Sequence, residues 1–440
     1  MVPCPSNVSI IGSRWVFSIK LKIDDSIERY KARLVAQGYK QEYRIDYIET
    51  FAPVAKMTTV RVFIALSAMH QWPISQMDVK NAFLHGNLKE TVYMKPPPGY
   101  SHSKSMVCKL KRSLYGLNQA PRAWFECFRQ VIVDASNKEG IAKLKELLCR
   151  SFQMKDLGPL TYFLGLEVHS SSRGYAVNQQ KYVLDLIQFA NLSNDKCVDT
   201  PMEVNVKLRK EDGEKLSNPS FYRQLVGRLL YLTMTRPDIA YAMQVVSQFV
   251  ADPRWLHLTA VLRIIRYLHG TISRGLFFSS HPCMQLQAYA DAYWAGCPDT
   301  RRSTTGWCVF LSDSLISWKC KKQKIVSKST AEAEYRAMSS ACSELTWLRG
   351  FLQTLTFPTP PSPLYADNMS AIRIASNPVF HERTKYIEVD CHFIRNMYLA
   401  GAITLPYIAS EHQIAYIFTK AMTTAQHKFL VSKLTLVSQP

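Results

Sequence analysis

One amphipathic segment in the C-terminal third limits the possible folds more than any other part of this sequence. Residues 331–355 carry apolar side chains at spacings of three and four, which predicts a helix whose buried stripe is Met338, Ala341, Leu345, Leu348 and Leu352. A helix with a single apolar stripe has to pack that face against a second layer. Glu334 lies four residues before Met338 and therefore shares the stripe. A carboxylate that points into a packed layer needs a cation or a metal as its partner.

The neighbouring segments predict the sheet that this helix covers. Residues 286–293, 303–311 and 315–319 have the pattern of strands, and Asp291 lies on the opposite face from the apolar residues of the first strand. Residues 364–367 predict a strand that ends in Asp367, although Asp367 could also be the N-cap of the next helix. Glu332 has a structural role in the capping box that begins at Ser329. We therefore expect a separate α/β domain in which a strand, a helix and a strand end each supply one acid.

A second candidate site lies in the N-terminal part. Residues 74–77 alternate apolar and polar, which predicts a strand that delivers Asp78 to its end, with Phe83 shortly beyond. A carboxylate at a strand end can hold a divalent metal, but most such Asp residues are turn or cap residues. Lys31 and Arg33 lie two residues apart on a predicted strand at 27–36 and point to one face. They form either a phosphate clamp or a solvated strand face.

Charge and cysteine content limit the partners and the compartment. The 54 Lys and Arg against 34 Asp and Glu give a net charge of +20, which favours a polyanionic partner because neutralised phosphates release their counterions. The alternative is a merely soluble basic protein. The 11 cysteines contain no C-x-x-C pair, so we expect neither a zinc site nor a disulfide framework, and an intracellular, reducing compartment. No apolar run reaches the roughly 20 residues of a membrane span, so no membrane partner is expected.

Longer motifs carry a resemblance to a known family. The most specific are Asp-Val-Lys-Asn-Ala-Phe-Leu-His-Gly at residues 78–86 and Ser-Leu-Tyr-Gly-Leu-Asn-Gln-Ala-Pro-Arg-Ala-Trp at residues 113–124. Together with residues 31–38, 51–56, 156–160 and 235–241 and the C-terminal third, they resemble the reverse transcriptase and ribonuclease H parts of the Pol polyprotein of copia-type long-terminal-repeat retrotransposons. The resemblance covers essentially the whole chain. It implies an α+β and α/β multidomain protein, a partial right-hand polymerase (fingers, palm, thumb) followed by a ribonuclease H-like α/β domain.

The resemblance also implies domain boundaries. Residues 1–156 would be partial fingers and palm, residues 157–274 a mainly helical thumb and connection, and residues 275–440 the ribonuclease H-like domain. Within the connection, residues 260–269 predict a helix with arginines at 263 and 266 off its stripe of Val261, Ile264, Ile265 and Leu268. These arginines are either solvated or contact the phosphates of a duplex without base specificity.

Site roles follow from the same resemblance. Asp78 would be the first metal-binding carboxylate of the polymerase and Phe83 the steric gate against a ribose 2′-hydroxyl. Lys31 and Arg33 would hold the incoming triphosphate, and residues 116–121 would line the template and nucleotide pocket, with Gly116 and Gln119 among them.

The implied partners and cofactor complete this expectation. Asp291, Glu334 and Asp367 match the acids of the ribonuclease H family, and the implied cofactor is Mg²⁺, in pairs about 3.5–4 Å apart. The implied partners are an RNA template, a DNA primer and an RNA–DNA hybrid. Deoxynucleotides would be the only small-molecule substrates.

Two departures from the family pattern predict that this copy is catalytically impaired. Relatives carry a longer stretch between Trp124 and Gly158 that includes a Tyr-Val-Asp-Asp hairpin, which this chain lacks. The gap near residues 130–137 is either an internal deletion or an artefact of the gene model, and Asp134 is either a remnant of the hairpin or a chance residue. Tyr416 stands where relatives have the acid of Ala-Asp-Ile-Phe-Thr-Lys. A neutral phenol of pKa about 10 should weaken one metal site.

A basic run follows the third predicted strand of the C-terminal domain. Lys319, Lys321, Lys322 and Lys324, with Trp318 beside them, predict either phosphate binding next to the nuclease site or a solvated face. The sequence thus predicts an RNA-directed DNA polymerase with a ribonuclease H acting on RNA–DNA hybrid, impaired in both sites. The alternative is a non-catalytic nucleic-acid-binding relic of a retrotransposon.

Overall fold

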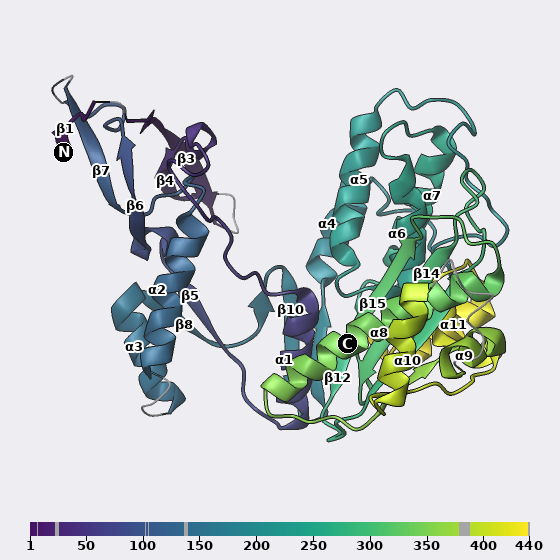
Figure 1. Ribbon diagram of the computed structural model, residues 1–440. Coiled ribbons are helices and arrows are strands. Elements are labelled where there is room, and N and C mark those ends of the chain that lie inside the picture. Colours follow the sequence, from purple (N-terminus) through teal and green to yellow (C-terminus); the bar gives the residue numbers. More distant parts are fainter. Residues whose placement is uncertain are drawn as a thin grey trace. The chain divides into compact units, whose positions relative to one another are not determined.

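The computed structural model describes residues 1–6, 8–22, 26–101, 103, 105–135, 140–377 and 388–438, with the side chains of residues 388–391 left out. It divides into two compact units, and Figure 1 shows the elements of each. Unit 1 is Met1–Ala55 with Ser75–Leu160, and unit 2 is Lys56–Ile74 with Thr161–Pro440. Residues 136–139, at the expected gap, lie outside the described residues. The prediction of an α+β multidomain fold is confirmed.

Unit 1 contains three small sheets. Strands β3 (Ser13–Leu21) and β4 (Ile27–Ala36) form an antiparallel hairpin, as the sequence predicts. A four-stranded sheet has the order β1-β7-β6-β2, from β1 (Val2–Pro3), β2 (Ile10–Ile11), β6 (Asn87–Met94) and β7 (Met106–Arg112). Strand β5 (Ser75–Val79) pairs antiparallel with β8 (Met154–Pro159). The helices are η1 (Gly38–Lys40), η2 (Ala82–His85), α2 (Ala120–Ala135) and α3 (Ile141–Phe152).

Unit 2 begins its second segment with strands that the sequence analysis missed. The expectation of a mainly helical segment from residue 157 is wrong at its start. There β9 (Tyr162–Phe163), β10 (Leu166–Ser171) and β11 (Gly174–Asn178) join an antiparallel sheet with β12 (Arg274–Ser279) and β18 (Leu436–Ser438). The missed signal is the alternation of apolar and polar residues from Leu166 to His169, which has the period of a strand.

The helices that follow have their own apolar core. They are α4 (Gln180–Phe189), α5 (Pro219–Leu232), η3 (Pro237–Ile239), α6 (Ala240–Val246), η4 (Ser247–Phe249) and α7 (Trp255–His269). The predicted stripe of α7 is fully buried in this core. Arg263 and Arg266 lie off the stripe and form ion pairs with Glu203 and Asp195. These arginines are therefore engaged within the protein.

The second sheet of unit 2 has five strands in the order β15-β14-β13-β16-β17. Strands β13 (Leu286–Tyr293), β14 (Thr304–Leu311) and β15 (Ser314–Lys322) are antiparallel, and β16 (Ser362–Tyr365) and β17 (Ile403–Thr404) run parallel to β13. The predicted helix is α8 (Thr330–Thr354), its stripe is fully buried, and Ser329 caps it. The other helices are α9 (Met369–Ser376), α10 (Glu388–Leu399), η6 (Ser410–His412), η7 (Ile414–Phe418) and α11 (Thr424–Lys433).

The boundaries of the two compact units do not coincide with those of the three expected domains. Helix α1 (Met57–Met69) comes from within residues 1–156 but belongs to unit 2. Its buried Arg61 donates to the carbonyl of Met234 at 2.8 Å and lies 3.8 Å from the ring centre of Trp318. The segments expected as connection and ribonuclease H domain share unit 2, because β12 pairs with both β11 and β18. Within the described residues, no helix combines the length and apolarity needed to cross a bilayer.

Candidate functional site

Three carboxylates from distant parts of the sequence meet at one end of the β13 sheet. Asp291 lies on β13, Glu334 on the second turn of α8, and Asp367 two residues after β16. One carboxylate oxygen from each lies within 4.8 Å of the other two. Among the described residues, this is the one group of three or more His, Cys, Asp or Glu side chains close enough to share a metal ion. The sequence analysis named all three.

Local contacts hold the two buried acids in place. The backbone N–H of Ala292 donates to Glu334 Oε2 at 3.1 Å, and the hydroxyl of Thr419 donates to Asp291 Oδ2. Thr419 can approach because the β14 residue opposite Asp291 is Gly306. A Cβ at Gly306 would lie 2.5 Å from Thr419 Cγ2 and 2.8 Å from Phe418 Cβ. The glycine therefore lets the η7 segment lie directly on the sheet.

Asp367 is not the N-cap of the following helix. That position belongs to Asn368, whose side chain accepts from the N–H of Ala371 at 3.0 Å. The N-cap alternative for Asp367 is therefore wrong, and its carboxylate is free to join the cluster.

The electrostatics of the cluster favour a bound cation. Burial raises the pKa of Asp291. It also raises the pKa of Glu334 well above its ordinary value, and the neighbouring Asp291 and Asp367 add to this. Ionising these carboxylates together costs free energy unless a positive charge lies between them. Oxygen donors of this kind are the ligands that hard divalent cations such as Mg²⁺ prefer. The donor set therefore fits a divalent metal.

Tyr416 lies beside the cluster, where the sequence analysis expected a fourth acid. Its hydroxyl donates to Asp367 Oδ2 at 2.6 Å, and the hydroxyl of Ser410 donates to the same oxygen at 2.8 Å. Lys420 Nζ lies 3.1 Å from the ring centre of Tyr416. This side of the cluster thus carries two hydrogen-bond donors and an ammonium group in place of an anionic ligand.

Asp78 belongs to no comparable cluster of acids among the described residues. It is exposed on β5 opposite Lys155 of β8, and it belongs to no group of three potential metal ligands among the described residues. Asp156 is opposite Met77, the neighbour of Asp78, and therefore faces the other side of this two-stranded sheet. Asp156 is also held by Lys145 at 2.9 Å. The structure gives Asp78 no partner acid there.

The other predicted polymerase residues differ in burial and in what they contact. Lys31 and Arg33 share a face of β4 and are partly buried. Phe83 packs edge-on against Tyr115, with ring centres 5.2 Å apart. Gly116 has φ +91°, and a Cβ there would lie 2.2 Å from the carbonyl oxygen of Ala36.

Gln119 is fully buried and bonded to Gln41 and to the carbonyl of Asp46. These contacts anchor the loop that contains Gln41 and Asp46, and nucleotide binding by Gln119 stays a prediction.

The four predicted phosphate-binding lysines do not share one face. Lys319 is half-buried and donates to Ser340 of α8 at 3.2 Å, and burial lowers its pKa. Lys322 points to the opposite face of β15 and donates to Gln248 of η4 at 2.5 Å. Lys321 and Lys324 are exposed. Phosphate binding by these lysines therefore stays a prediction. Lys321 and Lys324 are the two positions at which a substitution can test it, because both side chains are exposed.

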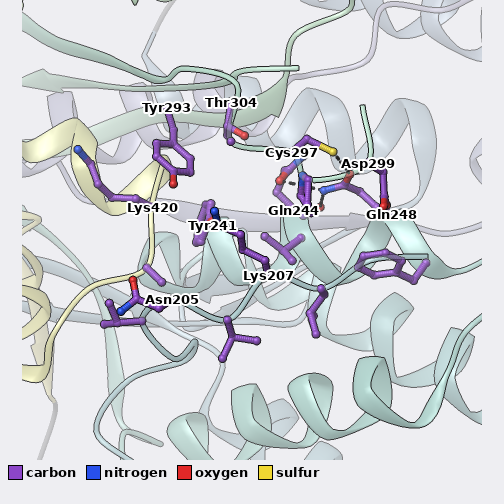
Figure 2. Close-up of a pocket in the computed structure, with 18 residues that line it drawn as sticks. Asn205, Lys207, Tyr241, Gln244, Gln248, Tyr293, Cys297, Asp299, Thr304 and Lys420 are labelled. Atoms are coloured by element: carbon purple, nitrogen blue, oxygen red, sulfur yellow. Dashed lines mark hydrogen bonds between the residues drawn. The ribbon is translucent and has the colours of Figure 1, made fainter. Parts of the chain in front are cut away.

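Sequence reasoning missed several residues around the cluster. Thr419 and Lys420 belong to the same short motif as Tyr416, so that motif could have indicated them. Ser410 carries no recognisable signal. A cavity of about 210 Å³ also lies beside this region. Figure 2 shows Tyr293, Thr304 and Lys420 among the residues that line it.

The strand order, the long helix across the sheet and the three convergent acids define a ribonuclease H-like domain in a chain that also carries a partial polymerase. The family described as "Reverse transcriptase (RNA-dependent DNA polymerase)" matches residues 1–139 and 130–204. The chain belongs to the reverse transcriptase family of retrotransposon Pol polyproteins.

Individual relatives agree with this assignment. The retrovirus-related Pol polyproteins from transposons RE1 and RE2 of Arabidopsis thaliana are 39% and 37% identical over 100% of this chain, covering 32% and 33% of their own lengths. A transposon Ty5-1 protein of Saccharomyces cerevisiae is 30% identical over 61% of this chain and 100% of its own length. The chain therefore spans about a third of the length of the Arabidopsis polyproteins.

Solved structures show more distant similarity. The foamy viral protease-reverse transcriptase in complex with RNA/DNA hybrid has TM-score 0.47 and 9% identity, covering 90% of this chain and 50% of that chain. RNase H1 from the archaeon Halobacterium salinarum has TM-score 0.23 and 14% identity, covering 30% of this chain and 90% of that chain.

Proposed function

We propose that this chain is the reverse transcriptase and ribonuclease H part of a copia-type Pol polyprotein. In this proposal its ribonuclease H cluster binds a divalent cation and an RNA–DNA hybrid, but cleaves the hybrid slowly. The observation that carries the proposal is the approach of Asp291, Glu334 and Asp367 to within 4.8 Å of one another. Its partners are an RNA template, a DNA primer and the hybrid, with deoxynucleotides as small molecules.

The three acids would hold Mg²⁺, and a bound Mg²⁺ supplies charge stabilisation and an activated water for phosphodiester cleavage. Asp291 and Glu334 are the buried ligands, fixed by Thr419 and by the N–H of Ala292. Asp367 is the most exposed of the three. It therefore lies on the side from which a nucleic-acid strand can approach.

The proposed impairment of the nuclease rests on Tyr416. An acid at this position would add a negative ligand, whereas the phenol instead engages Asp367 Oδ2 as a donor. That oxygen, with two hydroxyl donors, has less lone-pair density to offer a metal. One cation can still be shared by the three acids, but the paired-metal arrangement of this chemistry loses a ligand.

The proposed loss of polymerase activity rests on Asp78. Two metals need more than one carboxylate, and Asp78 has no partner acid on its face of the β5–β8 sheet. The match to the family is broken into two segments that meet at residues 130–139. The alignment with the RE1 polyprotein is also 475 positions long for a chain of 440 residues. Both findings support a shortened palm.

The test is cleavage of an end-labelled RNA–DNA hybrid with Mg²⁺ under single-turnover conditions. We expect slow cleavage by the natural chain and a rate at least about tenfold higher for Tyr416→Asp, since a metal ligand is gained. Tyr416→Phe is the matched control, because it removes the hydroxyl without adding a ligand. Family-like rates in the natural chain, unchanged in Tyr416→Asp, would refute the impairment.

The second candidate is a binding protein without catalytic activity. The ammonium of Lys420 beside Tyr416 favours it, because a fixed positive charge next to the acids competes with a metal. In that case the hybrid binds in a salt-sensitive manner, and neither Mg²⁺ nor Tyr416→Asp produces cleavage.

The ten cysteines in the described part of the chain are all free, which supports the proposal of a reducing, intracellular compartment.

A further inference from the structure

Cys297, in the wall of the cavity near the acid cluster, contacts the ammonium group of Lys322. Cys297 lies in the loop after β13 and is 9% exposed, and its Sγ is 3.5 Å from Lys322 Nζ of β15. Gln248 of η4 completes the group, since its Oε1 accepts from Lys322 Nζ at 2.5 Å and lies 3.9 Å from Cys297 Sγ. Figure 2 shows the sulfur of Cys297 beside Gln248 at the cavity of about 210 Å³.

The charge balance of this group calls for an anion. Lys322 is partly buried and forms no ion pair with a carboxylate among the described residues, so its neutral partner Gln248 leaves its charge uncompensated. The nearest group that can become negative is the thiol of Cys297. A thiolate 3.5 Å from this ammonium would be its counter-ion, and a nearby ammonium favours the thiolate form of a cysteine.

The cavity that Cys297 lines carries charged groups of both signs, two cations and one anion. The cavity wall also carries Lys207 and Lys420 as cations, Asp299 as its anion, and the phenols of Tyr241 and Tyr293. The carboxylate of Asp299 accepts from the backbone N–H of Lys210 at 3.2 Å.

Burial raises the pKa of the Cys297 thiol. Contacts with Thr300, the Lys322 ammonium and the N–H of Asp299 lower this pKa by more, so that it lies below the ordinary value for a thiol. Three other cysteines of unit 2 differ, because burial raises the pKa of Cys308 on β14 and of Cys320 on β15, and that of Cys342 on α8 to about 12.

We propose that Cys297 is a selectively reactive thiol, activated by Lys322, that hydroperoxides entering the cavity oxidise to sulfenic acid. The thiolate sulfur attacks one peroxide oxygen, so that an S–O bond forms as the O–O bond breaks. The leaving hydroxide or alkoxide takes a proton from water. Sulfur is oxidised by two electrons and the peroxide is reduced to water or an alcohol. This proposal is independent of the proposed nuclease function.

The first experiment compares all cysteines of the full chain in one reaction. The folded protein receives a short pulse of iodoacetamide at pH 7 and is then denatured. The remaining thiols are blocked with an isotopically heavier reagent, and peptide mass spectrometry gives a rate for each position. We expect Cys297 to react at least about tenfold faster than the buried Cys342, and faster than the exposed Cys197.

Matched variants separate activation from accessibility. Lys322→Met should slow alkylation of Cys297 several-fold and leave Cys197 unchanged, because it removes the ammonium group 3.5 Å from the thiol. Lys322→Arg keeps the charge and should keep most of the rate. Lys321→Met changes an exposed lysine of the same strand and should have no effect. A Cys297 rate equal to that of Cys342, or one indifferent to Lys322→Met, would overturn the activation.

The second experiment tests the oxidation itself. Hydrogen peroxide is added in the presence of dimedone, which traps sulfenic acids, and the adducts are located by mass spectrometry. We expect an adduct at Cys297 that is absent from Cys297→Ser and reduced in Lys322→Met. Rapid alkylation of Cys297 without any dimedone adduct would overturn the proposed reaction with hydroperoxides.

Discussion

At the scale of single residues, the protein contains two kinds of buried acid. Asp238 is fully buried, pairs with Arg236 at 2.8 Å and accepts from Tyr267 at 2.6 Å. Burial acts to raise its pKa, but Arg236, Arg274 and Tyr267 lower it more, well below the ordinary value. Asp291 and Glu334 have no such guanidinium, and burial raises the pKa of both. Asp238 is neutralised within the fold, whereas Asp291 and Glu334 keep raised pKa values even with Lys420 nearby, and a divalent cation would stabilise their ionised forms.

The first prediction concerns this internal ion pair. Asp238→Asn should lower the free energy of unfolding of unit 2 by about 3–5 kcal/mol, because Arg236 is left buried without a counter-ion. Denaturant unfolding followed by circular dichroism measures the change. The control is Asp199→Asn, which removes an exposed pair with Lys428 and should cost less than about 1 kcal/mol. Equal effects of the two variants would contradict the prediction.

The same pair predicts a pH dependence. Because the pKa of Asp238 is lower in the folded protein than in the unfolded chain, its stabilisation is fully present above the unfolded value of about 3.9. It is lost as the pH falls through the lower, folded value. The difference in stability between the natural chain and Asp238→Asn should therefore be constant near pH 7 and shrink below about pH 4. A difference that grows in acid would contradict this assignment.

At the scale of elements, the position of η7 on the sheet decides the geometry of the site. This short helix brings Tyr416 to Asp367, and the residue that follows its end, Thr419, to Asp291. The close approach depends on Gly306 of β14, because any larger side chain would overlap Thr419 and Phe418. A single backbone position in the sheet therefore controls how the last segment of the site docks.

The second structural prediction tests this docking. Gly306→Ala should destabilise unit 2 by about 1–3 kcal/mol, because the added methyl group overpacks the η7 contact. Gly350→Ala is the matched control, since a Cβ at this exposed position of α8 meets nothing within 4 Å. It should stabilise the helix by about 0.5–1 kcal/mol. Thermal unfolding of both variants distinguishes them, and a neutral Gly306→Ala would contradict the packing argument.

Elements with strong periodicity could be predicted from the sequence, whereas contacts between distant segments could not. The stripe of α8 and the alternation in β13 identified both elements, whereas the grouping of Glu334 with Asp291 and Asp367 came from the resemblance to the ribonuclease H family. The β9–β11 strands were missed because they are short and lie at the start of the segment that resembles a helix-rich connection. The hydroxyls of Ser410 and Thr419 meet the acids only through tertiary folding, so no local pattern could assign them.

At the scale of the whole molecule, the two units differ in how complete their sites are. Unit 2 assembles all three acids that the sequence analysis named, while unit 1 leaves Asp78 without a partner acid. The net charge of +20 belongs to the chain as a whole and favours binding to a polyanion. Binding of nucleic acid, which the charge favours, can therefore persist in this chain without the chemistry, which depends on the acids.

A further prediction concerns binding of nucleic acid. The intact chain should bind a fluorescent RNA–DNA hybrid, with an affinity that falls steeply between about 50 and 200 mM salt, because phosphate contacts release counterions. Fluorescence anisotropy measures the affinity. In the same solution, added deoxynucleotides should give no templated primer extension. Primer extension by the natural chain would contradict the assignment of an inactive polymerase site.

The central claim is that Asp291, Glu334 and Asp367 form the divalent-cation site of this chain. The most direct measurement titrates Mn²⁺ into the intact protein and follows the free ion by electron paramagnetic resonance. We expect Asp291→Asn to weaken binding at least about tenfold. Asp78→Asn, which removes the isolated carboxylate of unit 1, should leave binding unchanged. Binding that survives Asp291→Asn, or that is lost in Asp78→Asn, would contradict the claim.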